Sequence, residues 1–238
     1  MAYQEKSGIK SIDATKLTAN DSTAQQTLGT LRELADGRKF RYIKMTGSAL
    51  ALGQIVMPAT KVAVTNATSA NGVGPDGATT TIITDSDAAW TPGAYEGWYF
   101  QVATGMTGST EPIKIVANSV TTLTLEKQIT TALSSAGTDD GEILAGTAAG
   151  ILSTANDLDV DCLGVGIGTI TQNYYGWVQV AGPAAVVSDA ITEGDKICPG
   201  GNAAGQGIAM GDYTDNAIGV CVAASGTDEY CFVDLRIA

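Results

Sequence analysis

The stretch Ala49-Leu50-Ala51-Leu52-Gly53-Gln54-Ile55-Val56-Met57-Pro58 occurs a second time, in altered form, as Ala190-Ile191-Thr192-Glu193-Gly194-Asp195-Lys196-Ile197-Cys198-Pro199. Both copies contain alanine, an aliphatic residue, two further residues, glycine, a polar residue, any residue, an aliphatic residue, any residue and proline. This spacing is typical of a tight glycine turn that leads into a strand ended by proline. We therefore expect the two copies to form equivalent corners of one β-barrel.

Strand patterns surround both copies. Asp36-Gly37 is a hairpin signal between residues 28–35 and 38–45, and Phe40 and Tyr42 alternate with Lys39 and Arg41. A short helix over residues 28–34 is the competing interpretation, which Gly29 weakens. The C-terminal half contains four more strand-like runs, at residues 163–171, 176–180, 217–224 and 230–237.

Residues 63–142 have a different texture, rich in Thr, Ser, Ala, Asn and Gly. Turn signals occur at Asn71-Gly72 and Pro75-Asp76-Gly77, and strand-like runs at residues 79–84, 97–103, 111–117 and 121–126. The sequence therefore predicts an all-β protein. Its β-barrel or sandwich body comprises residues 28–62 and 143–238, residues 63–142 form a small inserted β-sandwich domain, and residues 1–27 form an extended N-terminal arm.

The charge of the chain is unevenly distributed. The first 44 residues hold eight of the 13 Lys and Arg and five acids, a net charge of +3, whereas the remainder holds five bases and 20 acids, or −15. We expect the N-terminal region to bind a partner, through Lys6, Lys10, Lys16, Arg38, Lys39 and Arg41. Nucleic acid is not an expected partner, because no basic surface is predicted beyond residue 44.

Residues that support catalysis or metal binding do not form a recognisable pattern. The chain has no histidine, which removes the commonest general base and metal ligand. Nucleotide-binding loops and serine-nucleophile motifs are missing, and Gly164, Gly166 and Gly168 are best explained as strand positions that another backbone approaches closely. We expect no enzymatic activity and no cofactor, although 25 scattered acids leave open a hydrolase with paired carboxylates.

Asp157, Asp159 and Asp161 alternate and would share one face of a strand, where a Ca²⁺ ion could neutralise them. A solvated acidic face is the preferred interpretation, because the spacing does not fit an EF-hand loop.

The four cysteines lie among apolar residues, which favours buried reduced thiols over a disulfide formed later; they are Cys162, Cys198, Cys221 and Cys231. The aromatic groups, Trp90, Tyr95, Trp98, Tyr99 and Phe100 and then Tyr174, Tyr175 and Trp177, are expected to be core, with a sugar-binding surface as the alternative.

The N-terminus lacks the apolar run of a secretory signal, and no run reaches the roughly 18 apolar residues of a membrane span. We therefore expect no membrane partner.

Two stretches of the chain resemble small structural proteins of tailed-bacteriophage virions. The first runs from Leu28-Gly29-Thr30 through Asp36-Gly37-Arg38 to Pro58, and the second includes Tyr175-Gly176-Trp177-Val178-Gln179-Val180, Gly194-Asp195-Lys196-Ile197 and Ile218-Gly219-Val220. The resemblance implies a capsid decoration (cement) protein, made in the host cytoplasm and located on the virion surface. It implies the major capsid protein as partner and a homotrimer as assembly, and it brings no site residues. The alternative is a carbohydrate- or receptor-binding head-fibre or tail module.

Overall fold

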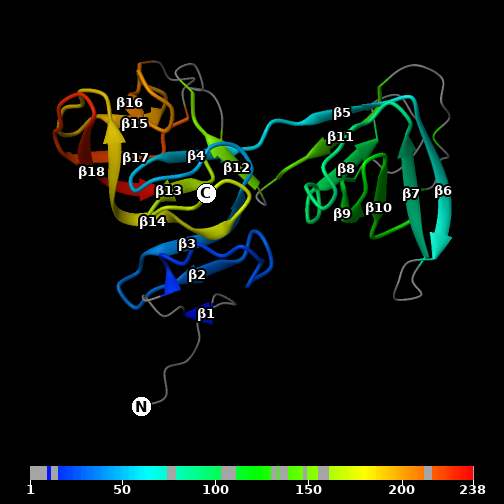
Figure 1. Cartoon of the computed structure of the whole chain (residues 1–238). Helices are drawn as coiled ribbons and strands as arrows, with labels where there is room; N and C mark the ends of the chain where they lie inside the picture. The colour runs from blue at the N-terminus through cyan, green and yellow to red at the C-terminus, as the bar shows by residue number, and fades with distance from the viewer. Residues whose placement is uncertain are drawn as a thin grey trace, which may run out of the picture. The chain divides into compact units, whose positions relative to one another are not determined.

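The structure is a computed structural model that describes residues 10–11, 16–73, 79–102, 111–129, 133, 139–146, 149–154, 161–211 and 216–237. The fold is all-β, and no α-helix occurs among these residues. The chain divides into two compact units, one formed by Met1–Pro58 with Thr147–Ala238 and the other by Ala59–Gly146 (Figure 1). The boundaries that we expected for the insert, residues 63 and 142, lie inside the second unit.

One large sheet forms the first unit, in the order β1-β2-β3-β12-β4-β13-β14-β16-β15-β17-β18. Its strands are β1 (Lys10–Ser11), β2 (Leu31–Glu33), β3 (Lys39–Met45), β4 (Ile55–Pro58), β12 (Ala149–Leu152), β13 (Gly164–Gly166), β14 (Tyr175–Ser188), β15 (Lys196–Pro199), β16 (Gly207–Ala209), β17 (Gly219–Ala223) and β18 (Glu229–Arg236). The predicted hairpin is confirmed, because β2 pairs antiparallel with β3 around Gly37, whose φ is +88°.

Two extra pairings, β3–β14 and β14–β18, close this sheet into two barrels. The first barrel is the ring β3, β12, β4, β13 and residues 175–181 of β14. The second barrel is the ring of residues 181–188 of β14 with β16, β15, β17 and β18. Both barrels therefore share the 14-residue strand β14, which extends from one to the other in Figure 1.

The two barrels follow the same plan. In each ring one neighbouring pair is parallel, β12–β3 or β16–β14, and the other pairs are antiparallel. The repeated turns precede β4 and β15, their glycines Gly53 and Gly194 have φ of +77° and +92°, and both strands end in proline. Isolated bridges close the same corner in each barrel, Leu50 with Ile170 and Ile191 with Ser225.

The register of the remaining strands completes the correspondence. Asn173 and Asp228, with φ of +65° and +62°, precede residues 175–181 of β14 and β18, so Tyr175 corresponds to Tyr230 and Trp177 to Phe232. The first unit is therefore an internal duplication. The expectation that both repeated turns lie in one barrel is wrong, because each turn belongs to its own barrel.

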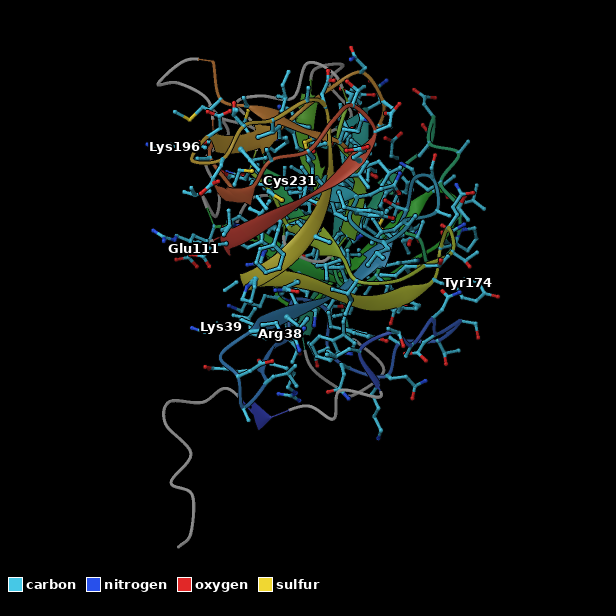
Figure 2. All side chains as sticks on the ribbon, turned by 90° about the vertical axis from the view of Figure 1, so that its left-hand side faces the viewer. Arg38, Lys39, Glu111, Tyr174, Lys196 and Cys231 are labelled. Atoms are coloured by element: carbon cyan, nitrogen blue, oxygen red, sulfur yellow. The ribbon has the colours of Figure 1, made fainter. Side chains whose placement is uncertain are left out.

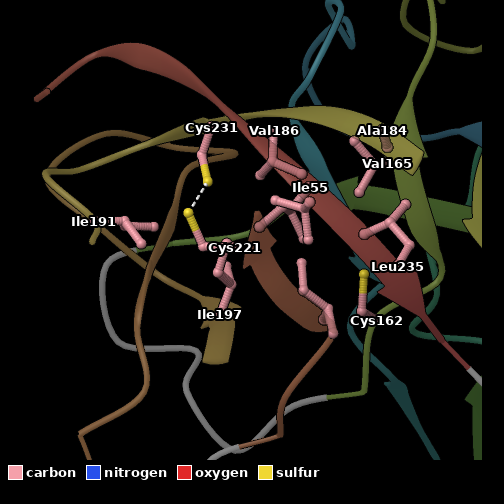
Figure 3. Packing of buried hydrophobic residues seen from close by; sticks show 12 residues of the cluster. Ile55, Cys162, Val165, Ala184, Val186, Ile191, Ile197, Cys221, Cys231 and Leu235 are labelled. Carbon is pink, nitrogen blue, oxygen red and sulfur yellow. Dashed lines mark hydrogen bonds between the residues drawn. The ribbon is translucent and has the colours of Figure 1, made fainter. Parts of the chain in front are cut away.

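Each barrel has its own apolar interior. The first barrel encloses Ile43, Met45, Leu50, Val56, Leu163, Ile170 and Val178. The second packs Ala184, Val186, Ile191, Ile197, Ile218, Cys221, Cys231, Val233 and Leu235, with Ile55, Cys162 and Val165 completing this core from the first (Figure 3). The expected close backbone approach is confirmed at Gly166, where a Cβ atom would overlap the Ala51 carbonyl oxygen, and at Gly164, where it would lie 3.0 Å from the Gln179 carbonyl oxygen. It is wrong for Gly168, which lies outside the strand and whose Cβ atom would lie 3.5 Å from Thr18 Cγ2.

The unit Ala59–Gly146 lies in the connection between β4 and β12, where the second barrel has only residues 200–206 between β15 and β16. It is one sheet in the order β5-β11-β8-β9-β10-β7-β6. Its strands are β5 (Val62–Thr65), β6 (Ala67–Val73), β7 (Thr79–Asp85), β8 (Tyr99–Val102), β9 (Ile113–Asn118), β10 (Thr122–Leu125) and β11 (Asp139–Leu144). The two edge strands β5 and β6 follow each other through Asn66, so the sheet curls into a nearly closed barrel.

Candidate interaction surfaces

Residues 16–34, named here the N-terminal cover, pack on the outside of the first barrel. Leu17 is buried against Phe40, Tyr42 and Trp177, and Leu28 and Leu34 pack against the same cluster. The ring centroids of Tyr42 and Trp177 are 5.0 Å apart. These outward side chains of β3 and β14, named here the first wall, are therefore shielded from solvent by the cover.

Polar contacts fix the cover in place. Asp21 and Tyr175 exchange backbone hydrogen bonds of 2.9 and 2.8 Å. The Tyr42 hydroxyl donates to Asp21 Oδ2 at 3.2 Å and accepts from the Gln25 N–H at 3.1 Å. Burial raises the pKa of the Tyr42 hydroxyl to about 12, and the Asp21 carboxylate contributes to the increase. Residues 16–27 thus belong to the folded body, which corrects that part of the extended arm that we expected over residues 1–27.

The six predicted docking residues differ in their surroundings. Lys6 and the side chain of Lys10 lie outside the described residues, and Lys16 is exposed. Arg38 and Lys39 are half-buried at the start of β3 (Figure 2), where Arg38 forms a 2.8 Å ion pair with Asp36. Arg41 is buried and donates to the Leu163 carbonyl oxygen at 3.2 Å, and burial lowers its pKa. Arg41 therefore does not belong to the docking surface, because the β3 register turns its side chain inward.

A second surface is the outer face of the second barrel. Val222, Tyr230 and Phe232 are 49%, 55% and 48% exposed. Tyr230 and Phe232 pair across β14–β18 with Val187 and Ala185, so these side chains share one face of the sheet. The turn with the exposed Leu52 adjoins this face, because a Cβ atom on Gly53 would lie 2.7 Å from the Tyr230 ring. We name this exposed apolar surface the second wall.

All four cysteines are buried and none forms a disulfide. Cys221 and Cys231 face each other on β17 and β18, with 2.7 Å between their sulfur atoms (Figure 3). Burial raises the pKa of the Cys231 thiol, and the adjacent Cys221 thiol raises it further. The corresponding residues of the first barrel are Gly166 and Gly176. A reaction between two facing thiols at these positions is therefore possible in the second barrel and not in the first.

The calcium site considered for the alternating aspartates lies mostly outside the described residues. Asp157 and Asp159 lie outside the described residues, and Asp161 is exposed. Within the described ranges, no group of His, Cys, Asp and Glu side chains is arranged to hold a metal ion.

The aromatic residues of the inserted unit are mostly core. Trp90 and Trp98 are buried, and Tyr95 packs edge-on against both, with centroid distances of 6.0 and 5.1 Å. Phe100 is also buried, whereas Tyr99 is exposed. A sugar-binding surface built on both tryptophans, the alternative suggested by the sequence, is therefore not formed by these side chains.

No family model, curated protein or solved structure matches the chain. In the part of the chain that the structure describes, no helix has the length and apolar character needed to span a membrane.

Proposed function

We propose that this chain is a structural protein of a phage virion that decorates and stabilises the capsid shell and docks through its N-terminal region. The observation that supports this proposal most is the position of the basic residues. Lys16, Arg38 and Lys39 lie on the cover and at the start of β3, whereas the chain beyond residue 44 carries a net charge of −15. Such a distribution favours attachment by one surface with the acidic remainder facing solvent.

The resemblance to virion proteins supports the same proposal. The two stretches that carry it include β2, β3 and β4, and then β14, β15 and β17, which all belong to the first unit. We propose the major capsid protein as partner and a homotrimer as the assembly, with no cofactor, no enzymatic activity, and neither nucleic acid nor membrane as partner.

The test measures binding to purified capsid shells that were assembled without this chain. Reversing the charges in Lys16→Glu, Arg38→Glu and Lys39→Glu together is expected to weaken binding at least about tenfold at low salt, with a smaller effect at high salt. A matched variant with Lys114→Glu, Lys127→Glu and Lys196→Glu has the same net charge and should bind as the unchanged chain does. Equal binding by both variants would contradict docking through the N-terminal region.

A deletion of residues 1–15 removes β1 and the residues around it and leaves the cover in place. It should weaken shell binding and leave the barrels folded. Deletion of residues 1–27 is a poorer test, because it also removes Leu17 and Asp21 of the cover and so exposes the first wall.

A further inference from the structure

The duplication makes it possible to compare two walls that occupy the same position in their barrels. Trp177 of the first wall is 4% exposed, whereas the corresponding Phe232 is 48% exposed. Ile167 packs against the covered cluster, and its counterpart Val222 is 49% exposed. The second wall thus has the apolar character of the first but no covering segment among the described residues.

The first wall also shows how such a surface is covered. The cover lies over it as a series of turns and bends that leads into β2, places leucines on the aromatic rings, and adds one antiparallel bridge, Asp21 with Tyr175. In the described part of the chain, no segment forms the corresponding bridge to Tyr230. An exposed apolar surface of this kind marks a site of interaction.

The size of the side chains on the second wall indicates which side chains a segment bound there must contribute. The first wall contributes Phe40 and Tyr42, which pair with Gln179 and Trp177. The corresponding positions of the second wall are Pro183 and Ala185, which pair with Asp234 and Phe232. Because these side chains are smaller, a covering segment needs large aliphatic or aromatic side chains of its own.

Backbone groups exclude one mode of binding. β2 adds to β3 beside Phe40, but Pro183 has no N–H group. The carbonyl oxygens of Ala181 and Pro183 already accept hydrogen bonds from the Gln179 side-chain amide, at 3.1 and 2.9 Å. A partner is therefore expected to lie across the face of the wall, as residues 17–28 of the cover do, and not to extend the sheet beside Pro183 as β2 extends it beside Phe40.

Charge determines the remaining property of the occupant. Three acids, Asp228, Glu229 and Asp234, border the wall. Two cations lie there as well: Lys196 pairs with Val220 on the same face, and Arg236 is engaged by Asp234 at 3.0 Å, so the acids are in excess. A second copy that docked wall to wall would bring these carboxylates together, which like-charge repulsion disfavours. Positive charge on the occupant would be complementary to this rim.

We propose that the second wall binds a basic segment of a partner protein that carries large apolar side chains, in the way that the first wall binds residues 16–34. This interaction goes beyond docking through the N-terminal region and is independent of the identity of the shell. It assigns Tyr230, Phe232 and Val222 as the residues that contact the partner.

The experiment uses the full chain and two labelled peptides. One has the sequence of residues 16–34, and the other has the same sequence with Asp21→Lys and Glu33→Lys, which makes it basic. Fluorescence anisotropy should show binding of the basic peptide with a Kd of about 100 μM or tighter, and weaker binding of the other. Binding of the basic peptide should weaken as salt is added.

Variants locate the site. Tyr230→Ser with Phe232→Ser should weaken binding of the basic peptide at least about tenfold. The matched control, Ile82→Ser with Val120→Ser, removes two exposed apolar side chains from the inserted unit and should leave binding unchanged. Because all four side chains are exposed, both variants are expected to fold, which circular dichroism checks.

Three results would overturn the proposal. The first is the absence of binding by the basic peptide at about 1 mM, and the second is equal binding by the wall variant and the control. The third comes from sedimentation velocity of the full chain. An oligomer that Tyr230→Ser with Phe232→Ser converts to monomers would make a second copy of this chain the occupant.

Discussion

The two barrels have the same strand plan but different surroundings. The first barrel has its wall covered by residues 16–34 and has an entire unit inserted between β4 and β12. The second barrel has an exposed wall, a short connection at the same place and a pair of facing cysteines. The comparison teaches that the ring of strands tolerates large differences outside it, because closure depends on backbone pairing and on the small interior cores.

The largest expected difference between the barrels concerns their aromatic side chains. Trp177→Ala should lower the free energy of unfolding by about 3–5 kcal/mol, because it leaves a cavity beneath the cover. Phe232→Ala removes a half-exposed side chain and should cost less than about 1 kcal/mol. Urea denaturation followed by circular dichroism measures both values. Equal losses would mean that the cover does not stabilise the first wall.

Oxidation should strengthen the second barrel only. With glutathione disulfide as oxidant, Cys221 and Cys231 are expected to form a disulfide while the oxidant is reduced to two glutathione molecules, stabilising the fold by about 2–3 kcal/mol. The raised pKa of Cys231 leaves little thiolate at neutral pH, so the reaction should be slow and should accelerate as pH rises.

Mass spectrometry and thermal denaturation check this prediction. The oxidised chain should lose two hydrogen atoms and melt at a higher temperature, and Cys231→Ser should show neither change. An unchanged mass after long incubation at about pH 9 would contradict it.

The glycines inside the two rings offer a closer comparison. A Cβ atom on Gly150 would overlap Val56 Cγ1, and one on the corresponding Gly207 would lie 2.8 Å from Ile197 Cγ2. Alanine at either position should cost about 1–3 kcal/mol of unfolding free energy, with Gly150→Ala the more severe. Gly168→Ala is the control, since its Cβ atom would lie 3.5 Å from Thr18 Cγ2. Equal stability of all three variants would show that the ring interiors are not crowded at Gly150 and Gly207.

The smallest effect is expected from removing the inserted unit. The second barrel shows a connection that suffices, so residues 59–148 can be replaced by Gly-Gly-Asn-Ala-Ala-Gly, the sequence of residues 200–205. Both barrels should fold and melt within a few degrees of the full chain. Solubility, circular dichroism and melting temperature provide the check, and an unfolded product would show that the barrels depend on the inserted unit.

Sequence patterns by themselves predicted most of the local structure. Alternation around Asp36-Gly37 predicted the β2–β3 hairpin, and the strand-like runs at residues 79–84, 111–117 and 121–126 correspond to β7, β9 and β10. The repeated turns were predicted correctly as equivalent corners, because glycine with positive φ and a terminal proline act within a few residues. Asn71-Gly72 was misleading, since both residues lie inside β6, where pairing with β7 outweighs the turn preference.

Only the tertiary structure decided how many barrels form, which side chains face outward and what covers them. β14 continues through Gly182-Pro183 to Ser188 because β18 pairs along that whole stretch, and this pairing closes the second barrel. Arg41 became an interior residue through the register of β3 against β14, where a shift by one residue would reverse every side chain. Leu17 is buried by residues far away in the chain, so periodicity near it could not reveal the cover. Local preferences act over a few residues, whereas ring closure and covering depend on contacts between distant segments.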